Sequence, residues 1–246
     1  MLKFNKKMKL SHAMSPALFL IFLISCSSAD INKLLQGVGG QGPLTQSEVS
    51  QGLKEALIQG ISKGADQAAE TDGFFRNELI KILLPEDARR VENTLRQVGL
   101  GAEVDRALLA INRGAERAAL EAKPIFIQAI RQMTIQDAFQ VLRGDEDAAT
   151  QFLRRSTESQ LIALFQPRIQ ESLNEVGATR FYGDIANSYN SLPLVNRKID
   201  PDLNAYVTER AIDGLFQLIA IEEKNIRENP LDRTTALMRR VFSAQD

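Results

Sequence analysis

Gly60-Ile61-Ser62-Lys63-Gly64-Ala65-Asp66-Gln67-Ala68-Ala69 is the stretch around which the sequence is organised, because the chain contains it twice. The second version, Ala110-Ile111-Asn112-Arg113-Gly114-Ala115-Glu116-Arg117-Ala118-Ala119, keeps the order small, Ile, polar, base, Gly, Ala, acid, polar, Ala, Ala. The same offset of 50 residues continues further along the chain, pairing Ile80 with Ile130, Lys81 with Arg131, Asp87 with Asp137, Ala88 with Ala138 and Val91 with Val141. Such self-similarity is typical of two helical units packed on each other. The alternative is a chance match at a single offset.

The composition favours a helical protein without nucleic-acid partners. The chain has 246 residues, 44% hydrophobic and 25% charged, which suffices for a sizeable core. It contains no Trp and only 6% aromatic residues, so the core must consist mainly of Leu, Ile, Val and Ala. Without the first 25 residues, 26 bases face 31 acids, a net charge of -5. A mildly acidic protein lacks the basic surface that attracts nucleic acid or anionic membranes.

The first 25 residues have the pattern of a secretory signal. Lys3, Lys6, Lys7 and Lys9 form a basic region, and the apolar run Ala17–Ile24 follows. Eight residues are too few to span a bilayer as a helix. We therefore expect residues 1–25 to be a signal peptide.

Cys26 is the candidate lipidation site. Leu23-Ile24-Ser25-Cys26 resembles the bacterial lipobox, whose Cys receives diacylglycerol before the signal is cut and the new amine is acylated. Each buried methylene contributes about 0.8 kcal/mol, so several acyl chains hold a soluble domain on a membrane. The next residue is Ser27 rather than the Asp that retains such lipoproteins at the inner membrane, which favours the outer membrane, facing the periplasm. The alternative is that Cys26 is an ordinary small residue in a signal peptide or membrane anchor.

Residues 26–46 are expected to be a flexible tether, and residues 47–246 a single all-helical domain. The tether is rich in Ser and Gly, and twenty coiled residues reach about 25 Å. Its segment Gly37–Gly42 lacks both the preceding strand and the following Gly-Lys-Ser/Thr of a phosphate loop, so we interpret it as linker.

The domain contains repeated signals of helix starts and stops and no hairpin signal. Capping patterns begin helices at Thr45, Thr134 and Thr235, and Asp200-Pro201-Asp202 opens a long helix that Asn229-Pro230 ends. Residues 74–84 are either a short helix or an extended segment, and Pro85-Glu86-Asp87 starts the next helix. We expect Lys123-Pro124 to break the helix that starts near Ala102. We expect Ser156 to interrupt the helix that ends near Glu175, and Pro167 to kink or break it. The predicted fold is an all-α multi-helix bundle of eight to ten helices, with two related units of about 50 residues followed by a C-terminal helical part.

Most common catalytic chemistry is excluded by residue type. The only His, His12, lies in the signal, and the only Cys is the lipidation candidate. This removes Ser-His-Asp and Cys-His catalysis, zinc sites built from His or Cys, and His-ligated haem. We therefore expect no enzyme, no cofactor and no metal site.

Carboxylates remain the one chemical option, and each group has a simpler interpretation. Asp145-Glu146-Asp147 lacks the ligand order of a calcium loop and fits a solvated helix start. Glu222-Glu223 fits an exposed helical face with ion pairs to Lys224 and Arg227. Asp66 and Glu116 occupy matching repeat positions where a metal could bind, although salt bridges with Lys63 and Arg113 are favoured.

Two further groups of residues also favour structural roles. Met133, Met238 and the Phe residues have helical spacing and fit the core. Asn229-Pro230-x-x-Arg233-Thr234-Thr235 is the densest polar motif, and a helix stop followed by a helix start is favoured over a ligand site there.

Several segments together resemble a bacterial envelope protein family known as domain of unknown function 4197, over about residues 48–242. They are Asp72-Gly73-Phe74, Ala122-Lys123-Pro124-Ile125-Phe126, Gln132-Met133-Thr134-Ile135-Gln136-Asp137-Ala138, Phe165-Gln166-Pro167, Tyr189-Asn190-Ser191-Leu192-Pro193-Leu194-Val195, Asp213-Gly214-Leu215-Phe216 and Asn229-Pro230 with Arg233-Thr234-Thr235. The resemblance implies an exported helical envelope protein and brings no established activity or catalytic residues.

The sequence therefore predicts a lipoprotein held in the outer membrane by acyl chains, including palmitate, at Cys26. The favoured role is a binding or structural module of the cell envelope, with another envelope protein as its partner. The alternative is a carrier of a small apolar or lipid ligand between helices. A carboxylate- or metal-dependent enzyme is the third and least favoured reading.

Overall fold

The computed structural model describes residues 42–191, 198 and 200–244. The residues from Leu44 onward belong to one compact unit. In the described residues there are eight α-helices, two short 3-10 helices and no strand, which confirms the predicted all-α multi-helix bundle. The elements are α2 (Gln46–Ala69), η1 (Glu86–Ala88), α3 (Arg89–Gln97), α4 (Gly101–Gln132), α5 (Ile135–Arg143), α6 (Ala148–Glu175), α7 (Ala178–Asn190), α8 (Leu203–Glu228), η2 (Pro230–Asp232) and α9 (Ala236–Ser243).

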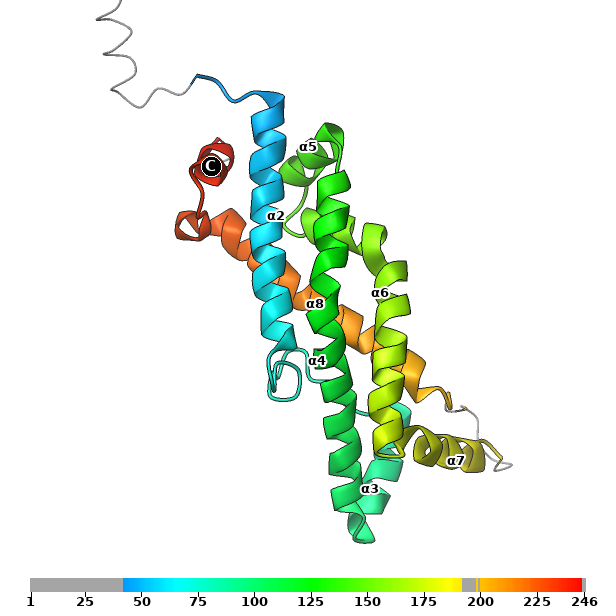
Figure 1. The fold of residues 1–246 in the computed structure, drawn as a ribbon. Coiled ribbons are helices and arrows are strands. Elements are labelled where there is room, and N and C mark those ends of the chain that lie inside the picture. Colours follow the sequence, from blue (N-terminus) through cyan, green and yellow to red (C-terminus); the bar gives the residue numbers. More distant parts are fainter. Residues whose placement is uncertain (1–41, 192–197, 199, 245–246) are drawn as a thin grey trace, which may run out of the picture. The chain divides into compact units, whose positions relative to one another are not determined.

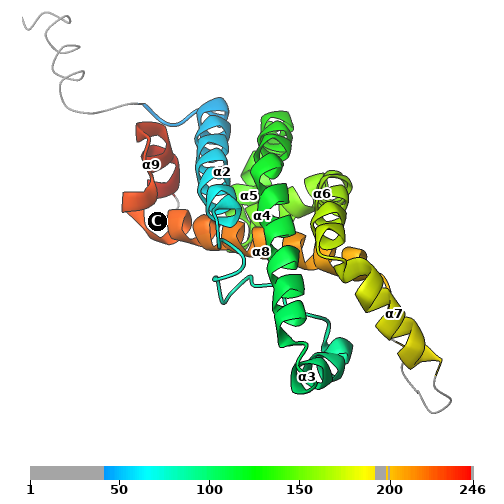
Figure 2. The ribbon, with the colours of Figure 1, turned by 60° about the horizontal axis from the view of Figure 1, so that its bottom comes forward.

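Three long helices, α2, α4 and α6, lie side by side, each antiparallel to its neighbour (Figure 1). The long helix α8 crosses one face of this layer and contacts all three (Figure 2). The short helices pack around the layer: α3 against α4, α5 against α2 and α6, α7 against α6 and α8, and α9 against α2. The crossing of α8 therefore closes the core.

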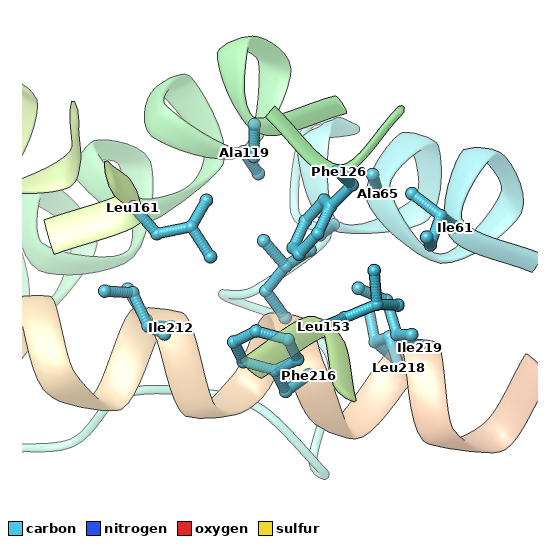
Figure 3. Close-up of a cluster of buried hydrophobic side chains, with 14 of the residues drawn as sticks. Ile61, Ala65, Ala119, Phe126, Leu153, Leu161, Ile212, Phe216, Leu218 and Ile219 are labelled. Carbon is cyan, nitrogen blue, oxygen red and sulfur yellow. The ribbon is translucent and has the colours of Figure 1, made fainter. Parts of the chain in front are cut away.

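The core contains mainly aliphatic side chains, as the composition predicts. Figure 3 shows its centre, where side chains of α2, α4 and α6 meet those of α8. The labelled residues are Ile61, Ala65, Ala119, Phe126, Leu153, Leu161, Ile212, Phe216, Leu218 and Ile219. Met133 and Met238 are also buried, which confirms their predicted place. Of the described helices, none has the length and apolar content needed to cross a bilayer.

The repeated stretch is a helix-packing motif. In both copies the Ile, the Gly at the fifth position and the following Ala are buried. A Cβ on Gly64 would lie 3.3 Å from the backbone of Leu218 and Ile219 in α8. A Cβ on Gly114 would lie 3.2 Å from the Cα of Ile169 in α6. Each copy thus lets its helix approach a neighbour closely.

The segments that follow the two copies of the motif are alike only in part. Each leads to a short helix, η1 with α3 (residues 86–97) after the first and α5 (Ile135–Arg143) after the second, with Ala88 and Ala138 buried at matching positions. α2 ends at Ala69, whereas α4 continues to Gln132. Ile80 and Ile130 are both buried, but Ile80 lies in an irregular segment and Ile130 in α4. The difference begins at Glu70, whose ψ of 154° is extended, and Asp72, with a φ of 69°, is also incompatible with a right-handed helix.

The predicted breaks at Pro124 and Ser156 are wrong, and of the two alternatives for Pro167 the break is wrong. α4 continues through Pro124, and α6 continues through both Ser156 and Pro167. Proline leaves the carbonyl four residues earlier without its donor. Here both prolines are exposed, and so are Leu120 and Ala163, the residues that carry these carbonyls. Water can therefore satisfy the carbonyls, and the packed faces of both helices stay intact.

The predicted helix caps are confirmed. Thr45 and Thr134 form complete capping boxes with Glu48 and Asp137. The side chains of Asp202 and Thr235 accept hydrogen bonds from the first turns of α8 and α9. These local signals set the starts of four helices.

The last helix packs on the first helix of the unit. A Cβ on Gly52 would lie 2.7 Å from Val241 Cγ2, so α2 and α9 are in close contact. Arg240 forms a salt bridge with Glu48 at 3.3 Å, and the Thr235 hydroxyl donates a hydrogen bond to Glu55 at 2.8 Å. The two ends of the described chain therefore meet.

Candidate functional site

The residues between α2 and η1, numbers 70–85, form an irregular segment that we call the strap. The sequence predicts either a short helix or an extended segment here. The strap is neither, because turns dominate its first part. A Cβ on Gly73 would collide with the Gln67 carbonyl oxygen, so only glycine fits this turn. The Asp72 carboxylate pairs with Arg76 at 3.0 Å and also with Arg113 of α4.

Two buried polar side chains of α4 hold the strap. Glu116 Oε1 accepts hydrogen bonds from the backbone N–H groups of Phe74 at 3.1 Å and Phe75 at 3.2 Å. Asn112 accepts from the N–H of Ile82 and donates to its carbonyl oxygen, both at 2.9 Å. These bonds satisfy backbone groups for which an irregular buried segment has no helical partner.

Arg113 is the third side chain of this cluster, and its contacts indicate that the cluster has a structural role. It pairs with Glu116, as the sequence predicts, and the hydrogen bond from Arg113 to Glu116 raises the pKa of the guanidinium. Asp66, the other candidate metal ligand, instead pairs with Lys123 at 2.6 Å rather than with Lys63. The two carboxylates thus have different partners, and in the part of the chain that the structure describes no three His, Cys, Asp or Glu side chains are grouped to hold a metal.

Three of the segments that carry the family resemblance meet in the core. Phe74 and Ile80 of the strap pack on Gly214, where a Cβ would lie 2.9 and 3.0 Å from their side chains. Phe126 meets Phe216 edge to face, with ring centroids 5.6 Å apart (Figure 3). These three segments therefore pack together at one place in the core, which indicates a structural role for them.

The prediction that Glu222 and Glu223 lie on an exposed face is wrong, since both are buried. Lys224 pairs with Glu146 and Glu228 instead of with either of them. Glu223 accepts hydrogen bonds from the N–H groups of Ala149 at 3.0 Å and Thr150 at 2.8 Å. It thereby caps the first turn of α6, where a carboxylate complements the helix dipole. The predicted ion pair with Arg227 is present at 2.8 Å.

Glu222 serves a different contact, between α8 and α2. It pairs with Lys63 at 2.8 Å, and this hydrogen bond raises the pKa of the Lys63 ammonium group. The carboxylate is buried, while more than half of the Lys63 side chain is exposed. The pair therefore lies at the edge of the core and connects the two helices.

Asp145, Glu146 and Asp147 are exposed, as predicted for a solvated cluster. Asp147 is the N-cap residue of α6, but its side chain makes no capping bond and accepts from Gln151 instead. The acids therefore mark the helix start correctly, whereas Glu223 supplies the cap.

The polar motif from Asn229 to Thr235 has the predicted stop-and-start role. Asn229 caps η2 and Thr235 caps α9. Arg233, only 1% exposed, donates to the carbonyl oxygens of Ile226 at 3.1 Å and Arg227 at 2.8 Å. Its guanidinium lies 5.4 Å from the centroid of the Phe242 ring. The motif thus joins the end of α8 to α9.

Two of the apolar spaces between helices are small. One cavity of about 20 Å³ lies beside Leu57, Leu153 and Ile226, and one of about 40 Å³ lies between α3, α4 and α7. Binding pockets for small ligands usually measure about 300–1,000 Å³. Neither space fits such a ligand.

A larger hollow, of about 250 Å³, opens at the surface between α4, α5 and α6. We call it the glutamine groove, and its lining residues are Ile125, Gln128, Ala129, Gln132, Asp137, Phe152, Ser156 and Gln160. We did not predict it from the sequence. Its signal is a pair of polar residues four apart on each long helix, beside apolar positions: Gln128 and Gln132, and Ser156 and Gln160.

Several predictions fall on residues that the structure does not describe. They concern the signal peptide of residues 1–25, His12, the linker segment up to residue 41 and the lipidation site Cys26. They stay predictions.

Comparison with known proteins gives one match. The family model described as "Protein of unknown function (DUF4197)" matches residues 43–243. No curated protein and no solved structure matches the chain significantly.

Proposed function

Starting from the finding that this chain belongs to the DUF4197 family of proteins of unknown function, we propose that it is a lipid-anchored binding or structural module of the bacterial envelope. In this proposal acyl chains at Cys26 hold the protein in the outer membrane. The helical domain faces the periplasm and engages another envelope protein.

The contacts made by the buried charged residues favour a binding role over a catalytic one. Glu116, Glu222, Glu223 and Arg233 are the buried charged residues among those described, and each bonds to a backbone segment or an ion-pair partner. Catalytic acids and bases usually lie in clefts where they reach the substrate. None of these four residues lines one of the larger surface hollows.

The size of the apolar cavities counts against a lipid carrier. A carrier must bury most of its ligand, whereas the cavity beside Leu57 and the one between α3, α4 and α7 hold about 20 and 40 Å³. Larger hollows such as the glutamine groove are open to solvent. Binding of a partner at the protein surface is therefore favoured over enclosure of a ligand between the helices.

Cell fractionation tests the anchor. Cys26→Ser should abolish incorporation of labelled palmitate and release the domain from the outer-membrane fraction without unfolding it. Ser27→Asp should move the protein to the inner-membrane fraction, and Ser28→Asp is the matched control. Retention of the Cys26→Ser protein in the outer membrane would refute the anchor.

A further inference from the structure

Two prolines lie at the same level of neighbouring helices. Arg168 of α6 donates two hydrogen bonds to the Glu121 carboxylate of α4, at 2.8 and 3.1 Å, which places these two residues opposite each other. Pro124 follows Glu121 by three residues, and Pro167 precedes Arg168 by one. Because α4 and α6 are antiparallel (Figure 1), both prolines lie on the same side of this ion pair, within about one helical turn of each other along the helix axes.

Each proline removes one backbone hydrogen bond from its helix. Pro124 and Pro167 lack the N–H that the carbonyl oxygens of Leu120 and Ala163 would accept in a regular helix. Sharp bends of helices occur mainly at prolines and at other sites where this hydrogen bonding is interrupted. The two neighbouring helices are therefore easiest to bend at the same level.

Helix α2 ends at this level. Its Asp66 pairs with Lys123 of α4 at 2.6 Å, and the helix ends three residues later at Ala69. Figure 1 shows that α4 and α6 continue beyond the end of α2. The level of the two prolines, which we call the boundary, therefore divides the domain in two. We call these a near part (residues 46–69, 125–163 and 203–243) and a far part (residues 86–120 and 168–190).

Each part is held together by contacts of its own. In the far part, a Cβ on Gly114 of α4 would lie 3.2 Å from the Cα of Ile169 in α6. In the near part, Glu223 of α8 caps the start of α6, and Arg227 donates to the Val141 carbonyl oxygen of α5 at 2.9 Å. Such close packing makes each part stiff in itself.

The chain crosses the boundary four times, and none of the crossings is a fully hydrogen-bonded helix in the described residues. Two crossings are α4 and α6, each with its proline. The other two are the strap and the connection from α7 to α8, whose described residues contain no α-helix. Proline sites and irregular segments are the places where hinge motions usually occur.

The strap limits how far the two parts can move. Its residues Phe74 and Ile80 pack on Gly214 of the near part, while Glu116 of the far part accepts the Phe74 N–H. The buried core is also continuous across the boundary. These contacts allow the far part to bend and keep the two parts from separating.

We propose that Pro124 and Pro167 form a hinge at which the far part bends relative to the near part. This inference does not depend on the proposed function, because it concerns contacts within the domain alone. The near part contains α2, where the chain enters the domain. Bending at the hinge thus changes the orientation of α3 and α7 relative to that end.

Pulsed EPR on the full chain tests the hinge by measuring distances between two nitroxide labels. The labels are attached to a ketone-bearing amino acid, which leaves Cys26 unused. One pair of labels, at the positions of Gln97 and Gln140, spans the boundary. A second pair, at Gln51 and Gln140, lies within the near part, and all three positions are exposed.

The double change Pro124→Ala and Pro167→Ala supplies the missing backbone N–H in both helices and should stiffen the hinge. Each restored hydrogen bond should lower the population of bent conformations by about fivefold. The distance distribution across the boundary should therefore narrow, while that within the near part should not change. The matched control is Pro43→Ala with Pro230→Ala, two exposed prolines outside α4 and α6, which should leave both distributions unchanged.

Three results would each overturn the hinge. The distribution across the boundary could be as narrow in the parent as the one within the near part, or it could keep its width in the double variant. The double change could also narrow both distributions equally, which would indicate general stiffening of the domain. None of these results bears on the anchor tests, so the hinge and the proposed function fail separately.

Discussion

Replacement of Glu116 tests the conclusion that this buried acid is structural. One carboxylate oxygen accepts the backbone N–H groups of Phe74 and Phe75, and the other pairs with Arg113. Glu116→Ala removes the acceptor of two N–H groups, of which that of Phe74 is buried. An unsatisfied buried donor costs about 1–3 kcal/mol, so the free energy of unfolding should fall by about 3–5 kcal/mol.

Glu116→Gln separates the charge from the hydrogen bonds. The glutamine oxygen can still accept both N–H groups, but the bonds lose their charge assistance and Arg113 loses one partner. Hydrogen bonds to charged groups exceed neutral ones by about 1 kcal/mol each, so the expected loss is about 1–2 kcal/mol.

Urea denaturation followed by circular dichroism measures both losses. Amide hydrogen exchange supplies a local measurement: the N–H groups of Phe74 and Phe75 should exchange faster in Glu116→Ala and change little in Glu116→Gln. A loss below about 1 kcal/mol in Glu116→Ala, with unchanged exchange at both amides, would refute the structural role of Glu116 in holding the strap.

Three further predictions concern single contacts of the fold. Gly214→Ala should be less stable than the control Gly183→Ala by about 1–3 kcal/mol. A Cβ at Gly214 would lie 2.9 Å from Phe74, whereas one at Gly183 has no neighbour within 4 Å. Equal thermal stabilities of the two variants would contradict this packing. Pro124→Ala should raise the free energy of unfolding by about 2 kcal/mol, since α4 passes through this exposed position. Urea denaturation measures this gain, with Pro85→Ala as the control. The same change in the free energy of unfolding in both variants would contradict the prediction. Asp137→Asn should lower the free energy of unfolding most at pH values above the unfolded-state pKa of about 3.9. The difference in this free energy between variant and parent should vanish as the pH falls through the lowered folded-state pKa of Asp137. Urea titrations that give the same difference at every pH would be inconsistent with a charged cap.

The sequence predicts the features of the fold that depend on local interactions. The capping boxes at Thr45 and Thr134 involve groups three residues apart, so the sequence alone contains both partners. The consequence of a proline depends instead on which side of the helix faces solvent. Pro124 is tolerated because of its place in the packed bundle, which spacing along the chain does not specify.

The candidate site was predictable only in part, because its contacts connect distant residues. Glu223 is buried because the first turn of α6 lies 73 and 74 residues earlier in the sequence but next to it in space. The strap likewise depends on Glu116, 41 and 42 residues away. The glutamine groove arises only when α4 and α6 lie antiparallel, although each wall has a visible spacing of four residues.

The contact of α9 with α2 determines when the chain can complete its fold during synthesis. α2 is made first, yet its packing partners include α8 and α9, which are made last. Until those helices emerge, Leu53 and Ile61 cannot bury their side chains against them, and a nascent chain stays exposed to aggregation or to chaperones. A ribosome-bound chain stalled before residue 203 should therefore be sensitive to protease in α2, and release of the full chain should protect it.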